Sequence, residues 1–232
     1  MNSDVHPPDK WLTFGFALIG GYGDAAGFVL AKTFTGHITG SLVLAAITAV
    51  ARDWRGTFGH FSAVACFLSG IPLSVLLARL SAVWPSWPTL TTVMVAEVIL
   101  IVTGYLALVS NACAALEIFV VCLSLALGLQ NGAFRRTGGI SVHTTYLTGM
   151  ITWLIATKAE QLAFRSASGP PTALDPKFGL LCGVWAVFLL GAVMGAAAAF
   201  HFKGLGILGA ALILLAIIGR NLMAVSQTRP AS

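Results

Sequence analysis

Charged residues are scarce in this 232-residue sequence, which contains 8 acidic and 13 basic residues. They make up 9% of the chain, against roughly 25% in a soluble domain, while hydrophobic residues make up 57%. The mean hydropathy is +0.90. A chain of this composition cannot cover itself with polar surface. It predicts an all-α polytopic membrane protein, a single membrane domain over residues 1–232 whose partner is the lipid bilayer.

Other features are absent as well. The first ten residues, MNSDVHPPDK, contain two aspartates and two prolines, which is a poor start for a signal peptide, so the first apolar run is expected to remain as a membrane helix. None of the four cysteines has metal-ligand spacing to another. We expect no metal and no cofactor. Basic residues stand at the ends of apolar runs, which indicates membrane loops and no nucleic-acid partner.

Eight apolar stretches lie between charged, glycine and proline breaks. They cover approximately residues 11–31, 37–51, 58–80, 90–110, 114–132, 144–157, 177–200 and 204–222. The second and sixth are short, because a helix of about 14 residues covers only about 21 Å of a hydrocarbon core of about 30 Å. We therefore expect six to eight spans, with the short stretches as half-helices or as spans completed by the polar residues before them.

A hydrophobic motif occurs twice in the chain. The first copy reads GGYGDAAGF…TFTGHITGSLV and the second reads LGLQNGAF…VHTTYLTGMIT. Alignment pairs Asp24 with Asn131 and His37 with Tyr146. The duplication predicts two tandem repeats of about four helical elements each. The repeats cover approximately residues 11–110 and 114–222.

The number of spans decides how the two repeats are related. Four spans in each repeat would make the repeats parallel, whereas one re-entrant element in each leaves three spans and makes them inverted. Arg52 and Arg55 follow the second stretch, and Lys158 and Arg165 follow the sixth. Two basic loops favour a cytoplasmic position for both, on the side of Lys10, and so favour the parallel arrangement. The inverted arrangement stays open.

The duplicated motifs resemble those of the YoaK-like family, an uncharacterised group of bacterial multi-spanning inner-membrane proteins. The resemblance extends over most of the chain and is carried by YGDAAGF from Tyr22, HITG from His37, QNGA from Gln130 with Arg135-Arg136, and TTYLTG from Thr144. Ser41 stands where an asparagine is expected, and Gly132 stands where alanine is common. The resemblance implies a multi-pass protein of a bacterial inner membrane, and it implies no established activity or substrate.

Asp24 is the most informative polar residue, because a carboxylate inside an apolar helix costs about 2.5–3.5 kcal/mol to insert. It is interpreted either as a group that binds a proton, a cation or a solute, or as a cap for backbone N–H groups around Gly20, Gly21 and Gly23. The sequence GYGD also matches the GxGD pattern of intramembrane aspartyl proteases. That chemistry requires a second carboxylate, and no other aspartate lies in an apolar stretch.

Three further groups of polar residues each have two possible roles. His37 and Tyr146 precede a Thr-Gly pair in each copy, and either could line a solute path or join helices by hydrogen bonds. Arg135 and Arg136 follow the fifth stretch and could contact an anion or lipid headgroups. Glu97 lies centrally in its stretch and could pair with a basic residue or relay protons.

Together these features favour a small-solute transporter or channel with a polar site where the two repeats meet. The predicted solute-binding residues are Tyr22, Asp24, His37, Thr39, Gln130, Asn131, Arg135, Arg136, Tyr146 and Thr148. The alternative is a non-transporting membrane scaffold or a subunit of a membrane complex, in which these residues pack without a cavity. An enzyme is not expected, since the chain has no HExxH and no serine motif beside a base. The solute and the existence of a homo-oligomer are left open.

Overall fold

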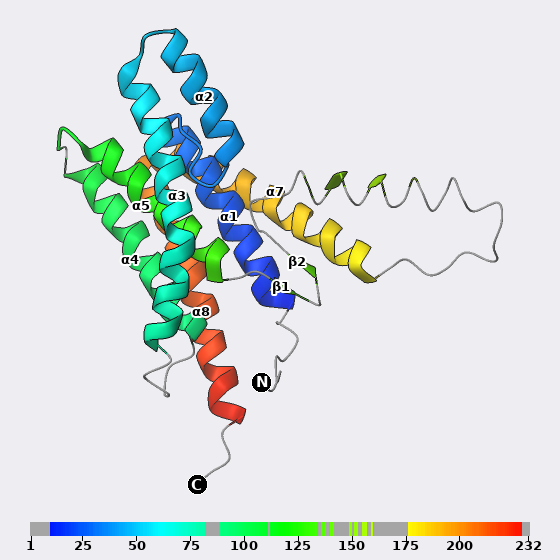
Figure 1. Ribbon diagram of the computed structural model, residues 1–232. Helices are drawn as coiled ribbons and strands as arrows, with labels where there is room; N and C mark the ends of the chain where they lie inside the picture. Colours follow the sequence, from blue (N-terminus) through cyan, green and yellow to red (C-terminus); the bar gives the residue numbers. More distant parts are fainter. Residues whose placement is uncertain are drawn as a thin grey trace.

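The computed structural model describes residues 10–81, 89–110, 112–133, 136–137, 140–141, 149, 151–152, 155–156, 159 and 176–228 (Figure 1). The long helices in these residues are α1 (Lys10–Ala31), α2 (Ile38–Val50), α3 (Trp54–Ser81), α4 (Thr89–Val109), α5 (Ala115–Ala133), α7 (Pro176–Phe202) and α8 (Leu208–Thr228). A 3-10 helix, η2 (Lys203–Ile207), joins α7 to α8. Two strands of two residues each, β1 (Arg136–Thr137) and β2 (Ile140–Ser141), form an antiparallel pair.

The helices coincide with the apolar stretches of the sequence, because the thickness of a bilayer sets the length of a spanning helix. Among the described residues, five ranges are long and apolar enough to cross a membrane, and the last of them, Phe178–Met223, covers η2 and most of α7 and α8. The prediction of an all-α polytopic membrane protein is confirmed. The sixth apolar stretch, 144–157, lies largely outside the described residues.

Helices α1 and α5 form the centre of the bundle and run antiparallel to each other. Gln130 of α5 donates a hydrogen bond from Nε2 to the carbonyl oxygen of Phe16 in α1, at 2.8 Å. Gly27, three turns further along α1, faces the side chain of Leu123, which lies earlier in α5. Because residue numbers rise along one helix and fall along the other, the two helices have opposite directions.

Each central helix packs closely along an outer helix through glycines. On α7, Gly191 and Gly195 face the backbone carbonyls of Leu18 and Tyr22 in α1, so α1 and α7 are parallel. A Cβ at either glycine would collide with the facing carbonyl. Glycine costs about 1 kcal/mol relative to alanine inside a helix, and here it permits the close approach of two backbones.

The contact between α5 and α3 has the same character. Gly128 of α5 faces the carbonyl of Phe67, and Gly132 faces the carbonyl of Ile71 one turn later, so these two helices are also parallel. Helices α4 and α8 pack against each other at the side of the bundle, and α4 also packs against α5. The bundle therefore has two central helices. Helix α1 packs against α7 and α8, and α5 packs against α3 and α4.

Helix α2 does not cross the bundle (Figure 1). Leu30, at the end of α1, lines the same pocket as Leu116 in the first turn of α5. Arg55, at the start of α3, donates a hydrogen bond from Nε to Oε1 of Glu117, which is also in the first turn of α5, at 2.8 Å. Since α1 ends and α3 begins at the same face of the bundle, residues 32–53 leave and return on one side. This segment, which leaves and rejoins the bundle at one face, is called the re-entrant element below.

The re-entrant path corrects one inference from charge. Arg52 and Arg55 lie at the face where α1 ends, whereas Lys10 begins α1 at the other face. The basic loop after the second stretch is therefore not on the side of Lys10. The physical reason is the length of α2, whose 13 residues reach only about 20 Å. An arrangement of eight parallel spans would also need α1 and α5 to have the same direction, which they do not.

Candidate functional site

The break between α1 and α2 is formed by Lys32–His37, named here the fold-back loop. Lys32 adopts a left-handed conformation with φ 56°, and its amide donates to the carbonyl of Phe28 at 2.9 Å. A left-handed residue commonly ends a helix and turns the chain away from its axis. The loop then descends beside α1, and α2 begins after its N-cap residue, His37.

Asp24 binds this loop from the side of α1. Its Oδ1 accepts hydrogen bonds from the backbone N–H groups of Thr35 and Gly36, both at 2.8 Å, and the residue is buried. A hydrogen bond to a charged group contributes about 1.5–3 kcal/mol. The carboxylate also lies at the N-terminal end of α2, where the helix dipole is positive. Asp24 therefore does not cap the glycines of α1, which is a continuous helix there.

His37 connects Asp24 with the surface. Its Nδ1 lies 3.7 Å from Oδ2 of Asp24, and the side chains are 38% and 8% exposed, respectively. The ring of His37 also lies against that of Phe34, with centroids 5.8 Å apart. The second carboxylate oxygen of Asp24 thus faces a half-exposed imidazole, while the first is held by the backbone.

Further contacts fix the loop in place. Thr33 Oγ1 shares a hydrogen bond of 3.1 Å with Nδ1 of His60 in α3, and both residues are buried. Ser41 Oγ donates to the carbonyl of Phe34 at 2.7 Å, and the Phe34 ring stacks on Phe28 at 4.5 Å. Sequence reasoning named Phe28 and Ser41 only as motif positions, and it missed Thr33, Phe34 and His60. The only signal for them was the Gly/Thr-rich break itself, which does not say which neighbours the loop contacts.

Several predicted solute-binding residues point elsewhere. Tyr22 donates from its hydroxyl to the carbonyl of Gly206 in η2 at 2.5 Å, on the side of α1 away from Asp24. Gln130 bonds to the α1 backbone at the helix crossing, and Asn131 donates from Nδ2 to the carbonyl of Leu127 in its own helix at 2.9 Å. Thr39 is exposed on α2. The structure thus joins Asp24 and His37 to each other and gives Tyr22 and Gln130 other neighbours.

The remaining predicted residues belong to the second copy of the motif. Arg135, Tyr146 and Thr148 lie outside the described residues. Of Arg136, only the backbone, in β1, is described.

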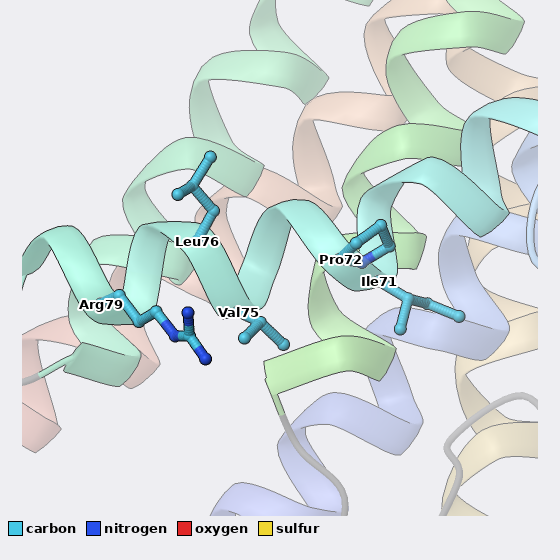
Figure 2. Close-up of a pocket in the computed structure, with 5 residues that line it drawn as sticks. All are labelled: Ile71, Pro72, Val75, Leu76 and Arg79. Carbon is cyan, nitrogen blue, oxygen red and sulfur yellow. The ribbon is translucent and has the colours of Figure 1, made fainter.

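Two surface pockets of about 390 and 400 Å³ are formed by other residues. The first is a shallow hollow along α3 lined by Ile71, Pro72, Val75, Leu76 and Arg79 (Figure 2). The second lies where the ends of α1 and α4 meet the start of α5 and Lys203 of η2. Asp24 and His37 line neither pocket. In the described part of the chain, no group of three or more His, Cys, Asp or Glu side chains could hold a metal ion.

The sequence matches a known family over most of its length. A family model described as "Protein of unknown function (DUF1275)" matches residues 12–219. The chain is similar to the UPF0700 transmembrane protein YoaK of Bacillus subtilis (strain 168), with 24% identity over 152 residues. That alignment covers 64% of this chain and 66% of the relative, just under two thirds of its length. No solved structure matches. The resemblance inferred from the duplicated motifs is thereby confirmed, and the chain is a multi-pass membrane protein that belongs to the DUF1275 family.

Proposed function

We propose that this protein is a small-solute transporter of a bacterial inner membrane, and that its solute binds beside Asp24. The observation that carries the proposal is a buried carboxylate in a long apolar helix, facing the residues that immediately precede α2. Secondary transporters commonly bind solutes where a discontinuous helix begins inside the membrane. There the helix dipole and unpaired backbone groups replace water around a polar solute.

The proposal includes two inverted repeats, approximately residues 11–110 and 114–222. The aligned helices α1 and α5 are antiparallel at the centre, and each packs along a parallel helix from the other half. The aligned glycines Gly21 and Gly128 make equivalent contacts, the first with the carbonyl of Phe188 in α7 and the second with that of Phe67 in α3. A pseudo-two-fold axis in the membrane plane produces such exchanged contacts, and it is frequent in transporters that alternate between two open states.

His37 gives the solute a route to Asp24. A carboxylate only accepts hydrogen bonds, so Oδ2 of Asp24 suits a donor group on the solute. That donor group would take the place now held by the imidazole of His37. His37 is partly exposed and can move away without disturbing the two backbone bonds at Oδ1. In this proposal the solute crosses the membrane without chemical change.

One observation favours a second candidate, a non-transporting scaffold. Asp24 is buried with its Oδ1 fully used by the fold-back loop, and neither described pocket reaches it. In a scaffold, Asp24 would serve only to close the loop. The two candidates differ in whether any solute competes for Oδ2.

The test is a thermal-unfolding screen of the detergent-purified protein with a broad panel of metabolites and inorganic ions. Wild type is compared with Asp24→Asn. Glu117→Gln is the matched control, because it removes one carboxylate charge from an exposed ion pair. A ligand present at a hundred times its dissociation constant adds about 2.7 kcal/mol of stability, so we expect a rise in melting temperature of about 5–10 °C.

Transport is supported if a compound raises the melting temperature of wild type and Glu117→Gln in a saturable manner and leaves Asp24→Asn unchanged. Equal stabilisation of all three proteins would assign binding to another surface. If no compound binds and Asp24→Asn only lowers the melting temperature in every condition, Asp24 acts as a structural residue and the scaffold replaces the transporter.

A further inference from the structure

Glu97 is a buried acidic residue in the middle of α4 that the proposed solute site does not use. Its side chain is 0% exposed, and neither Oε1 nor Oε2 has a hydrogen-bond partner among the described residues. Met94 and Ile101, one turn to either side on the same face of α4, belong to the buried core together with Phe119 of α5 and Leu214 of α8. Glu97 therefore faces the interior of the bundle and not lipid.

No described charge compensates this carboxyl group. Helix α4 packs against α3, α5, α8 and η2. The ionisable side chains on these elements are Arg55, His60, Cys66 and Arg79 of α3, Glu117 and Cys122 of α5, Lys203 of η2 and Arg220 of α8. None of them forms an ion pair or hydrogen bond with Glu97. On α4 itself, Tyr105 lies two turns further along.

The basic groups are occupied or distant along the helix. Arg55 is paired with Glu117 at 2.6 Å. Lys203 lies beside Leu108, at one end of α4, and α8 meets the other end through a hydrogen bond between Asn221 and Thr91. Thr91 is two turns from Glu97, about 9 Å along the axis. An ionised carboxylate in such surroundings, without partner or water, is so unfavourable that the neutral acid replaces it.

We propose that Glu97 is a proton-binding site, neutral in this conformation, and that its proton is the coupling ion of the transporter. The first half of this proposal stands by itself, and the second rests on the proposed transport function. The carboxylate takes one proton from water to become a carboxylic acid and returns that proton to water when the bundle opens on the other side. Only the O–H bond forms and breaks.

The proton fits this site better than a metal cation does. Sodium, magnesium and calcium ions require several oxygen ligands at once. Around Glu97 the described residues supply core hydrocarbon side chains, and no cluster of three potential metal ligands occurs in the described part of the chain. A proton needs one oxygen atom only.

The first test is infrared spectroscopy of the full chain in lipid vesicles at neutral pH. The spectrum of Glu97→Gln is subtracted from that of wild type. The expected difference is the carbonyl stretch of a neutral carboxylic acid. The control subtraction with Glu117→Gln is expected to give carboxylate bands instead, because Glu117 is half-exposed and bound to Arg55. Carboxylate bands in the Glu97 subtraction would overturn the proposal.

Folding of the variant is checked separately. Glutamine has the size and neutrality of protonated glutamate, so we expect Glu97→Gln to unfold within a few degrees of wild type at neutral pH. If the variant does not fold, wild type labelled with ¹³C-glutamate gives the same answer, because the chain contains few acidic residues. An acid carbonyl band shifted by the label supports the site, and its absence contradicts it.

Coupling is tested with vesicles that enclose a pH-sensitive dye. When the solute found in the thermal screen is added outside, wild type is expected to acidify the lumen if solute and proton move together, or to alkalinise it if they exchange. Glu97→Gln should bind that solute and leave the pH constant. Equal pH changes in both proteins would show that Glu97 does not carry the coupled proton. Failure of the solute site, in contrast, is seen with Asp24→Asn and does not alter the infrared result.

Discussion

Asp24 acts on the backbone of the fold-back loop, and its two hydrogen bonds make the reversal of the chain possible. A buried N–H group without an acceptor costs about 1–3 kcal/mol. The amides of Thr35 and Gly36 would carry that cost twice if no acceptor faced them. An amide oxygen can replace the carboxylate as an acceptor without its charge, whereas a methyl group cannot.

Substitutions at this position are therefore expected to destabilise the protein in a graded order. Asp24→Ala should lower the free energy of unfolding by about 2–5 kcal/mol, because alanine has no hydrogen-bond acceptor. Asp24→Asn should lower it by about 1–2 kcal/mol, because asparagine keeps a neutral acceptor. His37→Ala removes a longer, partly exposed contact and should lose less than about 1 kcal/mol. Thermal unfolding followed by circular dichroism in detergent gives the order. Equal losses for alanine and asparagine would show that the acceptor is unimportant.

At the scale of helices, the glycine contacts decide which elements pair. Both close pairs, α1 with α7 and α3 with α5, place a glycine of one helix on a backbone carbonyl of the other. Not every helical glycine has this role. Beyond the backbone of its own helix, Gly59 of α3 has no neighbouring atom within 4 Å of the position its Cβ would take. The same substitution at different glycines should therefore have opposite effects.

Alanine at Gly195 or Gly128 is expected to destabilise the bundle, because a Cβ there collides with a backbone carbonyl. Overpacking of this kind costs about 1–3 kcal/mol. Gly59→Ala is the matched control and should be neutral or stabilising by up to about 1 kcal/mol, since alanine is the better helix former. Unfolding by heat or denaturant compares the three variants. Similar melting temperatures for all of them would contradict the packing argument.

Sequence alone was sufficient for the helices and insufficient for their partners. Apolar length and glycine, proline and charge breaks predict α1 to α5, α7 and α8, since a bilayer restricts the length of a span. The direction of α2 was not predictable, because Arg52 and Arg55 suggest the wrong face and the contacts that anchor the loop are non-local. Asp24 was identified as important because it is a charged residue within an apolar stretch of the sequence. Its bonds to Thr35 and Gly36 depend on a loop geometry that no spacing encodes.

At the scale of the whole molecule, the re-entrant element determines which loops share a membrane face. Arg52, before α3, and Cys113, before α5, lie at the face where α1 ends, and Lys10 lies at the opposite face. An α2 helix that crossed the membrane would instead bring Arg52 to the side of Lys10. The two topologies thus differ in one observable position.

Cysteine labelling distinguishes these topologies. With the other three cysteines replaced by alanine, the exposed Cys113 serves as a native reporter. In intact cells a membrane-impermeant maleimide reaches only the outer face. We therefore expect Arg52→Cys, made without Cys113, to behave as Cys113 does, with both labelled or both protected. Lys10→Cys, also made without Cys113, should give the opposite result in intact cells. All three positions should react after permeabilisation. Labelling of positions 52 and 10 from one side would exclude the re-entrant path.

The fold-back loop also has a consequence for synthesis. Helix α1 meets its closest neighbour, α7, only after most of the chain has left the ribosome, so α1 first enters the membrane without it. The hydrogen-bond partners of Asp24 in α1 are synthesised much earlier than α7. The amides that receive Asp24 follow it by 11 and 12 residues and emerge almost together with it. The chain can therefore shield its carboxylate from lipid before the bundle that will surround it has been made.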